Sequence, residues 1–301
     1  MKSIASKKAR TARVAVIAVG FCCAATIAAT ALIPAAVAEP PGKDAIPHLA
    51  DHNFGWQTNV GDWQEPPPGS GHGPIKNDPR YPYISNAEGG RTGQQPTIRI
   101  ADVKDPILKP WAAAQMKASN DEALTGKRQV PFAAQARCYP GGVPGQLLYP
   151  FEPVYFAQTP KEVWMMWQRD HMVRRIFLTD KHSKDLKPDW FGESIGHYEN
   201  GDTLVVDTIG LSTKNSFIDN FRTPHTEKLH VVERFTISPD GKNLTAIATV
   251  EDPDTFNGPL VMQQRWFKVN NPMEETVCAE NNFDFFSQGL FPLPVADKSD
   301  F

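Results

Sequence analysis

The chain has 301 residues, of which 41% are hydrophobic and 22% are charged, and its formal net charge is −3. This balance is typical of a globular protein, and it excludes both a polytopic membrane protein and a fully disordered chain. It also excludes a protein that binds nucleic acid through bulk positive charge, because such proteins carry a surplus of Lys and Arg. We therefore expect no nucleic-acid partner.

The first 38 residues predict a secretory signal peptide. Basic residues precede an apolar run over residues 14–33, and Ala36-Val37-Ala38 supplies a small-x-small cleavage site. A single membrane-spanning helix is the alternative, because the run approaches the length that crosses a bilayer. The run is rich in the weakly apolar Ala and Val, which favours cleavage after Ala38. The mature chain would then be periplasmic or secreted, begin at Glu39, carry a net charge of −8 and make no membrane contact.

Cysteine usage predicts one disulfide. Removal of the leader would leave only Cys138 and Cys278, and two cysteines in an oxidising compartment most often pair. The bond would close a loop of about 140 residues, which the chain-entropy model values at about 4–5 kcal/mol. A catalytic thiol is the alternative, and the absence of a C-x-x-C pattern disfavours it.

Residues 39–125 predict an irregular arm with one helix. Proline and glycine crowd its first part, as in Pro66-Pro67-Pro68, and break regular structure. Aromatic residues nevertheless punctuate it, so we expect the arm to be held against a folded domain by these rings: Phe54, Trp56, Trp63, Tyr81 and Tyr83. Good helix formers predict a helix from Asp105 to Leu124, with Pro106 and Pro110 in its first turns.

Residues 126–301 predict a β-barrel-like domain. Eight runs rich in β-branched and aromatic side chains are separated by turn residues: 154–158, 162–168, 172–178, 194–199, 203–209, 229–237, 244–250 and 260–269. Asn200-Gly201 and Asp240-Gly241 are hairpin turn sequences between such runs. Consecutive strands without intervening helices favour an antiparallel up-and-down barrel of about eight strands, similar to that of lipocalins. A β-sandwich is the alternative, and a doubly wound fold is disfavoured.

Ionisable residues alternate with apolar ones inside several of these runs. Successive side chains of a strand point to opposite faces, so some charges are directed into the barrel. Buried charges are costly unless they are paired, and a barrel of this size holds either side chains or one small ligand. Inward charges would therefore pair with each other or meet a ligand. One set of large apolar residues suits either a ligand pocket or, as the favoured interpretation, ordinary core: Trp164, Met165, Met166, Trp167, Trp190 and Trp266.

The segment from Pro224 to Arg234 concentrates groups that suit acid–base chemistry. It holds two histidines, which titrate near neutral pH, together with two glutamates and an arginine. In the predicted catalytic set, His225 and His230 carry protons, and Glu233 or Glu199 is the carboxylate that orients them. Arg234 holds an anionic group of the substrate, and Asp207 is a reserve base. A purely structural ladder of His–Glu and Arg–Glu pairs across strands is the alternative.

Two other patterns give weaker hypotheses. Gly192-Glu193-Ser194-Ile195-Gly196 matches the G-x-S-x-G nucleophile elbow, and Asp207 and His225 follow it in the order Ser, Asp, His. The elbow requires a helix after the serine, whereas a turn into another strand follows here, which disfavours a serine hydrolase. A metal site would have to use scattered ligands that form neither an H-x-H nor an H-E-x-x-H pattern, namely His197, Glu199, His225 and His230. We therefore expect no metal and no other cofactor.

Two stretches, Asp189–Gly210 and Pro224–Arg234, contain the motifs W-x-G-x-S-[IV]-G-x-[WY]-E-x-G-D-T-L-V-V-D-T and P-H-[ST]-E-x-L-H-V-x-E-R. Together with Cys138–Pro144, Val250–Pro253 and Cys278, they resemble a family of exported bacterial proteins. The resemblance covers about residues 138–282 and implies export and a bond between the two cysteines. It brings no activity with it. After Cys278 the sequence departs from the glycine-containing turn of the family.

These observations lead to two functional hypotheses. The first is an exported, cofactor-free enzyme that applies acid–base chemistry to a small apolar or amphipathic organic molecule, as a lyase, isomerase or hydrolase. The second is a periplasmic binding or carrier protein with the same barrel and pocket but no chemistry. An enzyme requires a histidine of the Pro224–Arg234 segment inside a cavity with a carboxylate partner, whereas a binding protein requires neither.

Overall fold

The computed structural model describes residues 45–51, 53–125, 134, 138–214 and 216–278. The chain divides into two units, Met1–Ala38 and Glu39–Phe301, and all described residues belong to the second. The predicted signal peptide and the predicted domain boundary at residue 126 therefore lie outside the described residues.

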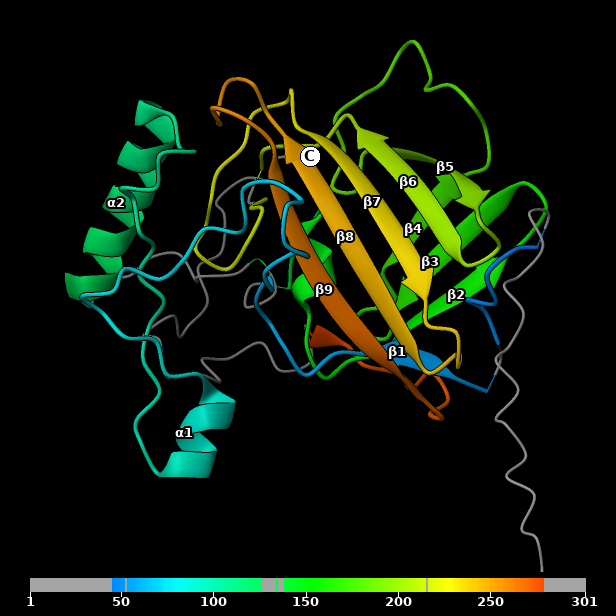
Figure 1. Cartoon of the computed structure of the whole chain (residues 1–301), viewed down its shortest axis with the longest axis horizontal. Coiled ribbons are helices and arrows are strands. Elements are labelled where there is room, and N and C mark those ends of the chain that lie inside the picture. Colours follow the sequence, from blue (N-terminus) through cyan, green and yellow to red (C-terminus); the bar gives the residue numbers. More distant parts are fainter. Residues whose placement is uncertain (1–44, 52, 126–133, 135–137, 215, 279–301) are drawn as a thin grey trace, which may run out of the picture. The chain divides into compact units, whose positions relative to one another are not determined.

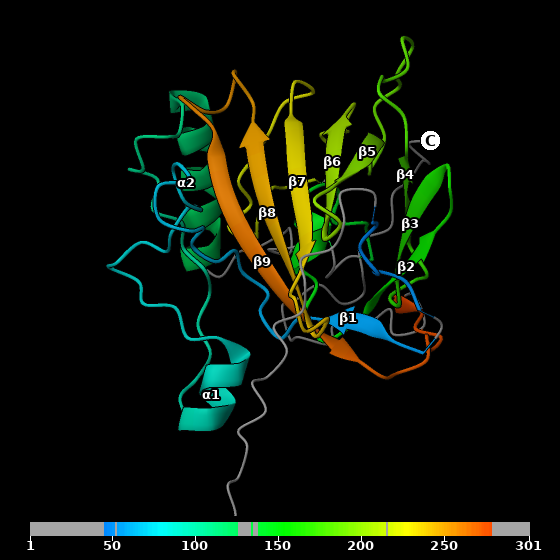
Figure 2. The same ribbon diagram turned by 45° about the vertical axis from the view of Figure 1, so that its right-hand side comes forward.

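In the described part of the chain, nine strands form one closed barrel (Figure 1, Figure 2). The strands are β1 (Gly55–Gln57), β2 (Val154–Gln158), β3 (Glu162–Trp167), β4 (Val173–Phe177), β5 (Glu193–Glu199), β6 (Thr203–Ile209), β7 (His230–Ile237), β8 (Asn243–Glu251) and β9 (Leu260–Val269). They follow the sequence order around the barrel, and β1 closes it by pairing with both β2 and β9. The predicted mainly β barrel is confirmed, and the alternative sandwich is not needed.

Each of the eight predicted runs forms a strand, because alternating β-branched and aromatic residues fit a pleated, half-buried surface. The predicted hairpin between β5 and β6 turns at Asn200 and Gly201, whose φ angles of 54° and 75° are the positive values that a type I′ turn requires. Gly241, with a φ of 67°, serves the predicted turn between β7 and β8.

Two features differ from the predicted antiparallel meander. Strand β1 comes from the arm, and its three residues are too few for an alternation pattern to mark it in the sequence. Trp56 of β1 pairs with Val154 on one side and with Lys268 on the other, so this short segment closes the sheet. Strands β4 and β5 are parallel, because the connection over residues 178–192 brings the chain back to the end where β4 begins. The barrel is therefore mixed rather than wholly antiparallel.

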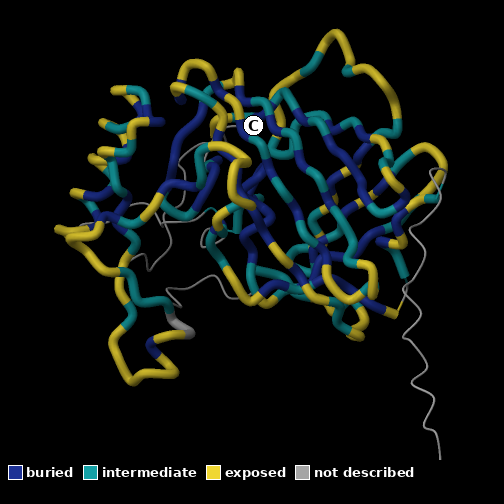
Figure 3. The backbone as a smooth tube through the Cα atoms, in the orientation of Figure 1, coloured by how far each residue is buried: buried dark blue, intermediate teal, exposed yellow. Residues whose placement is uncertain are grey.

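Large side chains pack in the core of the barrel, and Figure 3 shows buried positions concentrated along its strands. Every second residue of a strand points inwards, which explains why these residues are buried: Trp56, Met165, Trp167, Phe235 and Trp266. The interpretation as core is thus confirmed for Met165, Trp167 and Trp266. Trp164 faces outwards, and Trp190 stacks on Tyr139 with ring centroids 5.4 Å apart.

Two α-helices lie in the described part of the arm, α1 (Asn86–Thr92) and α2 (Pro110–Thr125). The prediction of a helix start at Asp105 was wrong, because α2 begins at Pro110. Proline fits the first position of a helix, where no N–H is needed, and it disfavours helical backbone in the residue before it. The preceding segment forms turns instead, in which Asp105 Oδ1 accepts a hydrogen bond from the Ile107 N–H at 3.0 Å.

Aromatic rings fasten the first part of the arm to the barrel. Three of the five arm aromatics are buried: Phe54, Trp56 and Trp63. The Trp63 indole also donates a hydrogen bond to the Ile218 carbonyl at 2.9 Å, which ties the arm to the long connection between β6 and β7. The other two rings, Tyr81 and Tyr83, lie beside arginine side chains of the arm.

Helix α2 stands outside the barrel, next to the turn between β8 and β9 (Figure 2). The buried Asn120 amide bonds both backbone groups of Ala101, at 3.0 and 2.9 Å, and the Trp111 indole donates to the Asp254 carbonyl at 2.6 Å. The Asn120 bonds fix the helix against the preceding arm, and the Trp111 bond fixes it against the loop that follows β8. No helix in the described part of the chain has the length and apolar character that crossing a bilayer requires.

Cys138 and Cys278 form the predicted disulfide, with their sulfur atoms 2.15 Å apart. The bond joins the segment before β2 to the segment after β9, and the two cysteines are 140 residues apart in the sequence. It therefore encloses every strand of the barrel except β1.

Candidate functional site

The six residues predicted as catalytic do not lie together. Glu233 points into the barrel, and His225 lies beside a pocket formed by a long connection and by α2. The other four lie on the outer face of the sheet: Glu199, Asp207, His230 and Arg234. Alternation explains the separation, because neighbours in a strand such as Glu233 and Arg234 point to opposite faces. The structure therefore places the residues of the predicted single site in three locations, and those of the outer face form two separate networks.

Glu233 belongs to a well-bonded polar cluster inside the barrel. Its two carboxylate oxygens accept hydrogen bonds from Arg174 Nη1 and Nη2 at 3.1 and 2.5 Å. Arg174 Nε also donates to Ser194 Oγ at 3.0 Å, and Nη2 donates to Thr208 Oγ1 at 2.8 Å. All four residues are at most 2% exposed, so a bidentate ion pair is enclosed with its supporting hydroxyl groups. Glu233 therefore stabilises a buried arginine and orients no histidine.

The same cluster explains why the G-x-S-x-G pattern does not produce a catalytic triad. Ser194 Oγ lies inside the barrel, 3.0 Å from both Arg174 Nε and Thr208 Oγ1. Asp207 faces outwards, and His225 lies in a loop beyond the sheet. Among the described residues, no hydrogen bond joins these three side chains.

Arg234 and Glu199 form part of a ladder on the outer face. Arg234 Nη2 donates to Glu199 Oε2 at 2.5 Å, and His197 Nε2 lies 2.9 Å from Glu199 Oε1. The hydrogen bond from Arg234, together with that of His197, lowers the pKa of Glu199 to about 2. The guanidinium is thus engaged by a carboxylate of its own chain, as in the structural alternative to the predicted site.

Asp207 and His230 belong to a second outer-face network, which also contains His182. Asp207 Oδ1 lies 3.0 Å from both His182 Nε2 and His230 Nε2. The other ring nitrogen of His182 lies 2.9 Å from Glu193 Oε2, and that of His230 lies 3.5 Å from Glu251 Oε2. Because carboxylates only accept hydrogen bonds, His182 makes both contacts as a donor only when it is protonated. The network fastens the connection between β4 and β5 to the barrel.

Sequence reasoning missed His182, because it lies in an irregular connection that carries no periodic pattern. The four candidate metal ligands do not converge, since three lie in the two outer-face networks and His225 lies beside the pocket. Across the described residues, no group of three or more His, Cys, Asp or Glu side chains is arranged so that it could hold a metal ion.

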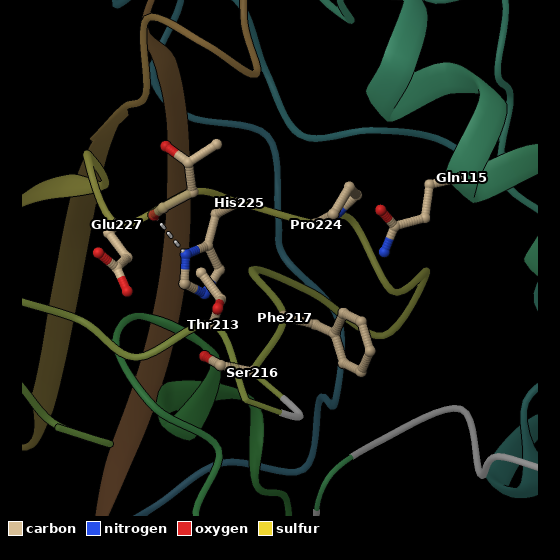
Figure 4. Close-up of a pocket in the computed structure, with 8 residues that line it drawn as sticks. Gln115, Thr213, Ser216, Phe217, Pro224, His225 and Glu227 are labelled. Atoms are coloured by element: carbon tan, nitrogen blue, oxygen red, sulfur yellow. Dashed lines mark hydrogen bonds between the residues drawn. The ribbon is translucent and has the colours of Figure 1, made fainter. Parts of the chain in front are cut away.

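A pocket of about 440 Å³ lies between α2 and the long connection from β6 to β7 (Figure 4). Gln115, Thr213 and Glu227 are exposed and form its rim, whereas Ser216 and His225 are buried. The described residues that line it are Gln115, Thr213, Ser216, Phe217, Pro224, His225, Thr226 and Glu227.

Asp219 shapes the connection that carries the pocket. Its carboxylate accepts hydrogen bonds from the Phe221 and Thr223 backbone N–H groups at 2.9 and 3.1 Å, and from the Thr223 hydroxyl at 2.6 Å. This is an Asx-type turn, in which an aspartate side chain takes the place of a backbone acceptor. Burial raises the pKa of Asp219 to about 6, although the hydrogen bonds oppose this shift.

Asp252 anchors the residue that follows His225. Its carboxylate accepts hydrogen bonds from the Thr226 N–H at 2.6 Å and from the Thr226 hydroxyl at 3.0 Å, and also from the Thr255 hydroxyl at 2.8 Å. Burial opposes the ionisation of Asp252, but these hydrogen bonds outweigh it and lower its pKa below the usual range. A charged carboxylate therefore fixes the backbone that presents His225 to the pocket.

Two glycines pack against the loop that supplies Ser216 and Phe217 to the pocket. A Cβ atom at Gly145 would lie 2.6 Å from the Phe217 carbonyl oxygen, and one at Gly142 would lie 2.7 Å from Ser216 Oγ. Gly142 also has a φ of 68°, which side chains rarely allow. Glycine therefore lets the loop with Ser216 and Phe217 approach the short 3₁₀ helix η2 (Gly145–Leu148).

His225 has a buried nitrogen without a partner. The residue is 6% exposed, and its Nδ1 lies 2.9 Å from the Thr226 carbonyl oxygen, which only accepts, so Nδ1 carries the proton. Nε2 is buried and has no hydrogen-bond partner among the residues that the structure describes. Burial lowers the pKa of His225, and the Thr226 carbonyl and the charge of Asp252 offset this only in part. At neutral pH the side chain is a neutral imidazole with a free lone pair on Nε2.

Of the pocket residues, the sequence predicted a role for His225 alone. Gln115 belongs to a helix that is distant in the sequence, and Ser216 belongs to an irregular connection, so no local sequence pattern linked either residue to His225. No protein-family model matches the chain, and neither a curated protein nor a solved structure matches it significantly. Because barrel folds host many unrelated functions, the function has to be inferred from the His225 pocket itself.

Proposed function

We propose that this protein is an exported enzyme that moves a proton on a small amphipathic molecule without a cofactor, and that His225 Nε2 is the proton acceptor. The reaction belongs to the lyase, isomerase or hydrolase class. The observation that carries the proposal is the buried, unpartnered Nε2 of His225 at the pocket.

A buried polar atom without a partner calls for a physical reason, because such an atom typically costs about 1–3 kcal/mol. A ligand that donates a hydrogen bond to Nε2 would remove this cost. The lowered pKa of His225 keeps the ring neutral at physiological pH, and neutral imidazole is the form in which a histidine accepts a proton.

In the proposed step, Nε2 takes a proton from a donor atom of the bound molecule and the ring becomes an imidazolium. The Thr226 carbonyl continues to accept from Nδ1, and the nearby charge of Asp252 favours the positive ring. The proton then returns to the product or to the leaving group, so the histidine is regenerated without an electron acceptor. The hydroxyl groups of Thr213 and Ser216 are available to hold the molecule in place.

A binding or carrier protein is the second candidate function. The Nδ1 partner of His225 is a carbonyl oxygen, whereas the imidazolium of a catalytic histidine is commonly stabilised by a directly bonded carboxylate. With a carbonyl partner at Nδ1, Nε2 of His225 is better suited to accept a hydrogen bond than to act as a strong base. Both functions use the same pocket and differ only in turnover.

Export is part of the proposal. It is supported by the predicted signal peptide and by the Cys138–Cys278 disulfide, since disulfides persist in oxidising compartments. The resemblance to exported bacterial proteins points the same way. We therefore expect the reaction to take place in the periplasm or outside the cell.

The test compares the wild-type protein with His225→Asn. Asparagine keeps an N–H group near the position of Nδ1, so it can still donate to the Thr226 carbonyl, but it has no nitrogen at the position of Nε2. Both proteins are incubated with a small-molecule extract of bacterial periplasm, and the compounds are followed by mass spectrometry. His197→Asn is the matched control, because the His197 side chain lies on the outer face and is 61% exposed.

We expect the wild type and His197→Asn to convert at least one compound into a product, and His225→Asn to do so at least about 100-fold more slowly. Thermal unfolding checks that each variant is folded. If the wild type converts nothing but retains a compound through dialysis, the protein is a carrier and the enzyme proposal is wrong. Equal conversion by folded His225→Asn would exclude His225 as the proton acceptor.

A further inference from the structure

We propose that the pocket beside His225 takes a molecule that bears a hydroxyl or amino group on a compact apolar body and that carries no negative charge. The inference rests on the proposed function, since it names the class of molecule that meets His225. It follows from the charges, the hydrogen-bonding groups and the apolar surface of the pocket lining.

The lining offers no positive charge to an anion. Neither lysine nor arginine occurs among the described residues that line the pocket, whereas the carboxylate of Glu227 does. The cations of the adjoining segments are engaged elsewhere. Lys228 Nζ lies 2.8 Å from Asp254, Arg222 Nη1 lies 3.7 Å from Glu122, and Lys214, next to Thr213, is not free either. A carboxylate or phosphate would therefore lose water without gaining a counter-charge, and it would meet Glu227 as a like charge.

The buried end of the pocket requires a hydrogen-bond donor. Because Nδ1 of His225 holds the ring proton, Nε2 offers only a lone pair. A hydroxyl or amino group satisfies this lone pair, whereas a carboxylate or a carbonyl oxygen brings no hydrogen to it. Ser216 is buried in the same lining, and its hydroxyl can accept a second hydrogen bond or donate one.

The apolar surface lies on one side of the pocket. Figure 4 shows Phe217 and Pro224 on that side together with the exposed Gln115 of the rim, and His225 and Glu227 on the other side. A molecule with a polar group at one end and an apolar body at the other matches this division. The volume of about 440 Å³ is in the range of small-molecule sites.

The test uses three probes with similar aromatic bodies and different head groups: benzyl alcohol, benzylamine and benzoate. Each is titrated into the mature chain near neutral pH, and binding is followed by the NMR shifts of the His225 ring and of the Ser216 and Thr226 amides. This measurement does not depend on turnover.

We expect benzyl alcohol and benzylamine to bind, and benzoate to bind at least about tenfold more weakly. His225→Asn should weaken the alcohol about tenfold, because the acceptor is removed. Glu227→Gln should weaken benzylamine more than benzyl alcohol, because it removes only a negative charge. Glu88→Gln on α1, outside the pocket lining, is the control and should change neither.

Benzoate that binds as tightly as benzyl alcohol would overturn the inference, and so would the absence of shifts with all three probes at their solubility limits. The inference and the proposed function can fail separately. Tight benzoate binding would leave proton transfer intact as long as His225→Asn still loses product formation. Binding of the alcohol without any product formation would overturn the enzyme and leave a carrier for such molecules.

Discussion

The barrel interior and the loop pocket both bury polar side chains, but their hydrogen bonding differs. Inside the barrel, Arg174 and Glu233 form two hydrogen bonds with each other, and Ser194 and Thr208 accept further bonds from the same guanidinium. In the pocket, His225 is nearly as buried, yet no described residue is a hydrogen-bond partner of its Nε2.

This difference separates a structural group from a functional one on physical grounds. A buried ion pair whose oxygens and nitrogens are all bonded has its hydrogen bonding satisfied in the free protein, so it has little left to bind a ligand. A buried acceptor nitrogen without a partner gains its hydrogen bond only when another molecule donates to it. By this criterion the inward pair of the barrel is structural. Among the described residues, Gln146 Nε2 and Asp170 Oδ2 are also buried without a partner, but of the three residues only His225 lines the pocket, which makes it the candidate site.

The largest expected effect is in the barrel interior. Glu233→Gln leaves the buried Arg174 without its counter-charge, so we expect the free energy of unfolding, measured by urea denaturation, to fall by about 3–5 kcal/mol. Replacing both partners with apolar residues, as Arg174→Met with Glu233→Leu, should recover most of this loss, because no unpaired charge is left.

Glu199→Gln is the matched control for that experiment. Glu199 of β5 also pairs with an arginine of another strand, Arg234 of β7, but both side chains are partly exposed, so we expect a loss of at most about 1 kcal/mol. A similarly small loss in Glu233→Gln would contradict the structural role of the buried pair.

Asp219 represents an intermediate case, a buried carboxylate that has hydrogen-bond donors but no bonded cation in the described part of the chain. Its pKa is raised from 3.8 to about 6, so the folded state holds this proton more tightly than the unfolded state. The resulting stabilisation is complete below pH 3.8 and is lost as the pH rises through about 6, by on the order of 2–3 kcal/mol. Asp219→Asn should remove this slope. Equal slopes for both proteins in denaturation series between pH 4 and pH 7 would contradict the shift.

The smallest effect is expected on the outer face. His182→Gln breaks the bridge between Glu193 and Asp207, and we expect a loss of at most about 1 kcal/mol because the network is partly exposed. Hydrogen exchange should increase over the connection between β4 and β5 and remain unchanged elsewhere. His197→Gln on the same outer face should leave that connection protected. Unchanged exchange in His182→Gln would show that other contacts hold the connection.

Much of the barrel could be predicted because strand formation is a local property. In β7, for example, Val231 and Glu233 point inwards while His230 and Arg234 point outwards, as alternation requires. Closure and strand direction depend on more distant parts of the chain. The three residues of β1 show no pattern, and the direction of β5 is set by the path of the irregular connection before it.

The candidate site was only partly predictable, because a dense motif does not place its residues together. Alternation in β7 already places Glu233 and Arg234 on opposite faces of the sheet, so the predicted single site grouped side chains that do not meet. Arg174 could have been found, since it shares the inward face of β4 with Ile176. The walls around His225 could not, because contacts such as the approach of Gly145 to Phe217 arise only in the folded chain.

The central claim is that His225 is a neutral imidazole with its proton on Nδ1 and a free lone pair on Nε2. Nitrogen-15 NMR of the histidine rings measures both the tautomer and the pKa, and His225→Asn assigns the signal. We predict a protonated Nδ1 and an unprotonated Nε2 at neutral pH, a titration midpoint below 6.5, and a change at Nε2 when benzyl alcohol is added. A proton on Nε2 at neutral pH, or a midpoint above 6.5, would contradict the account.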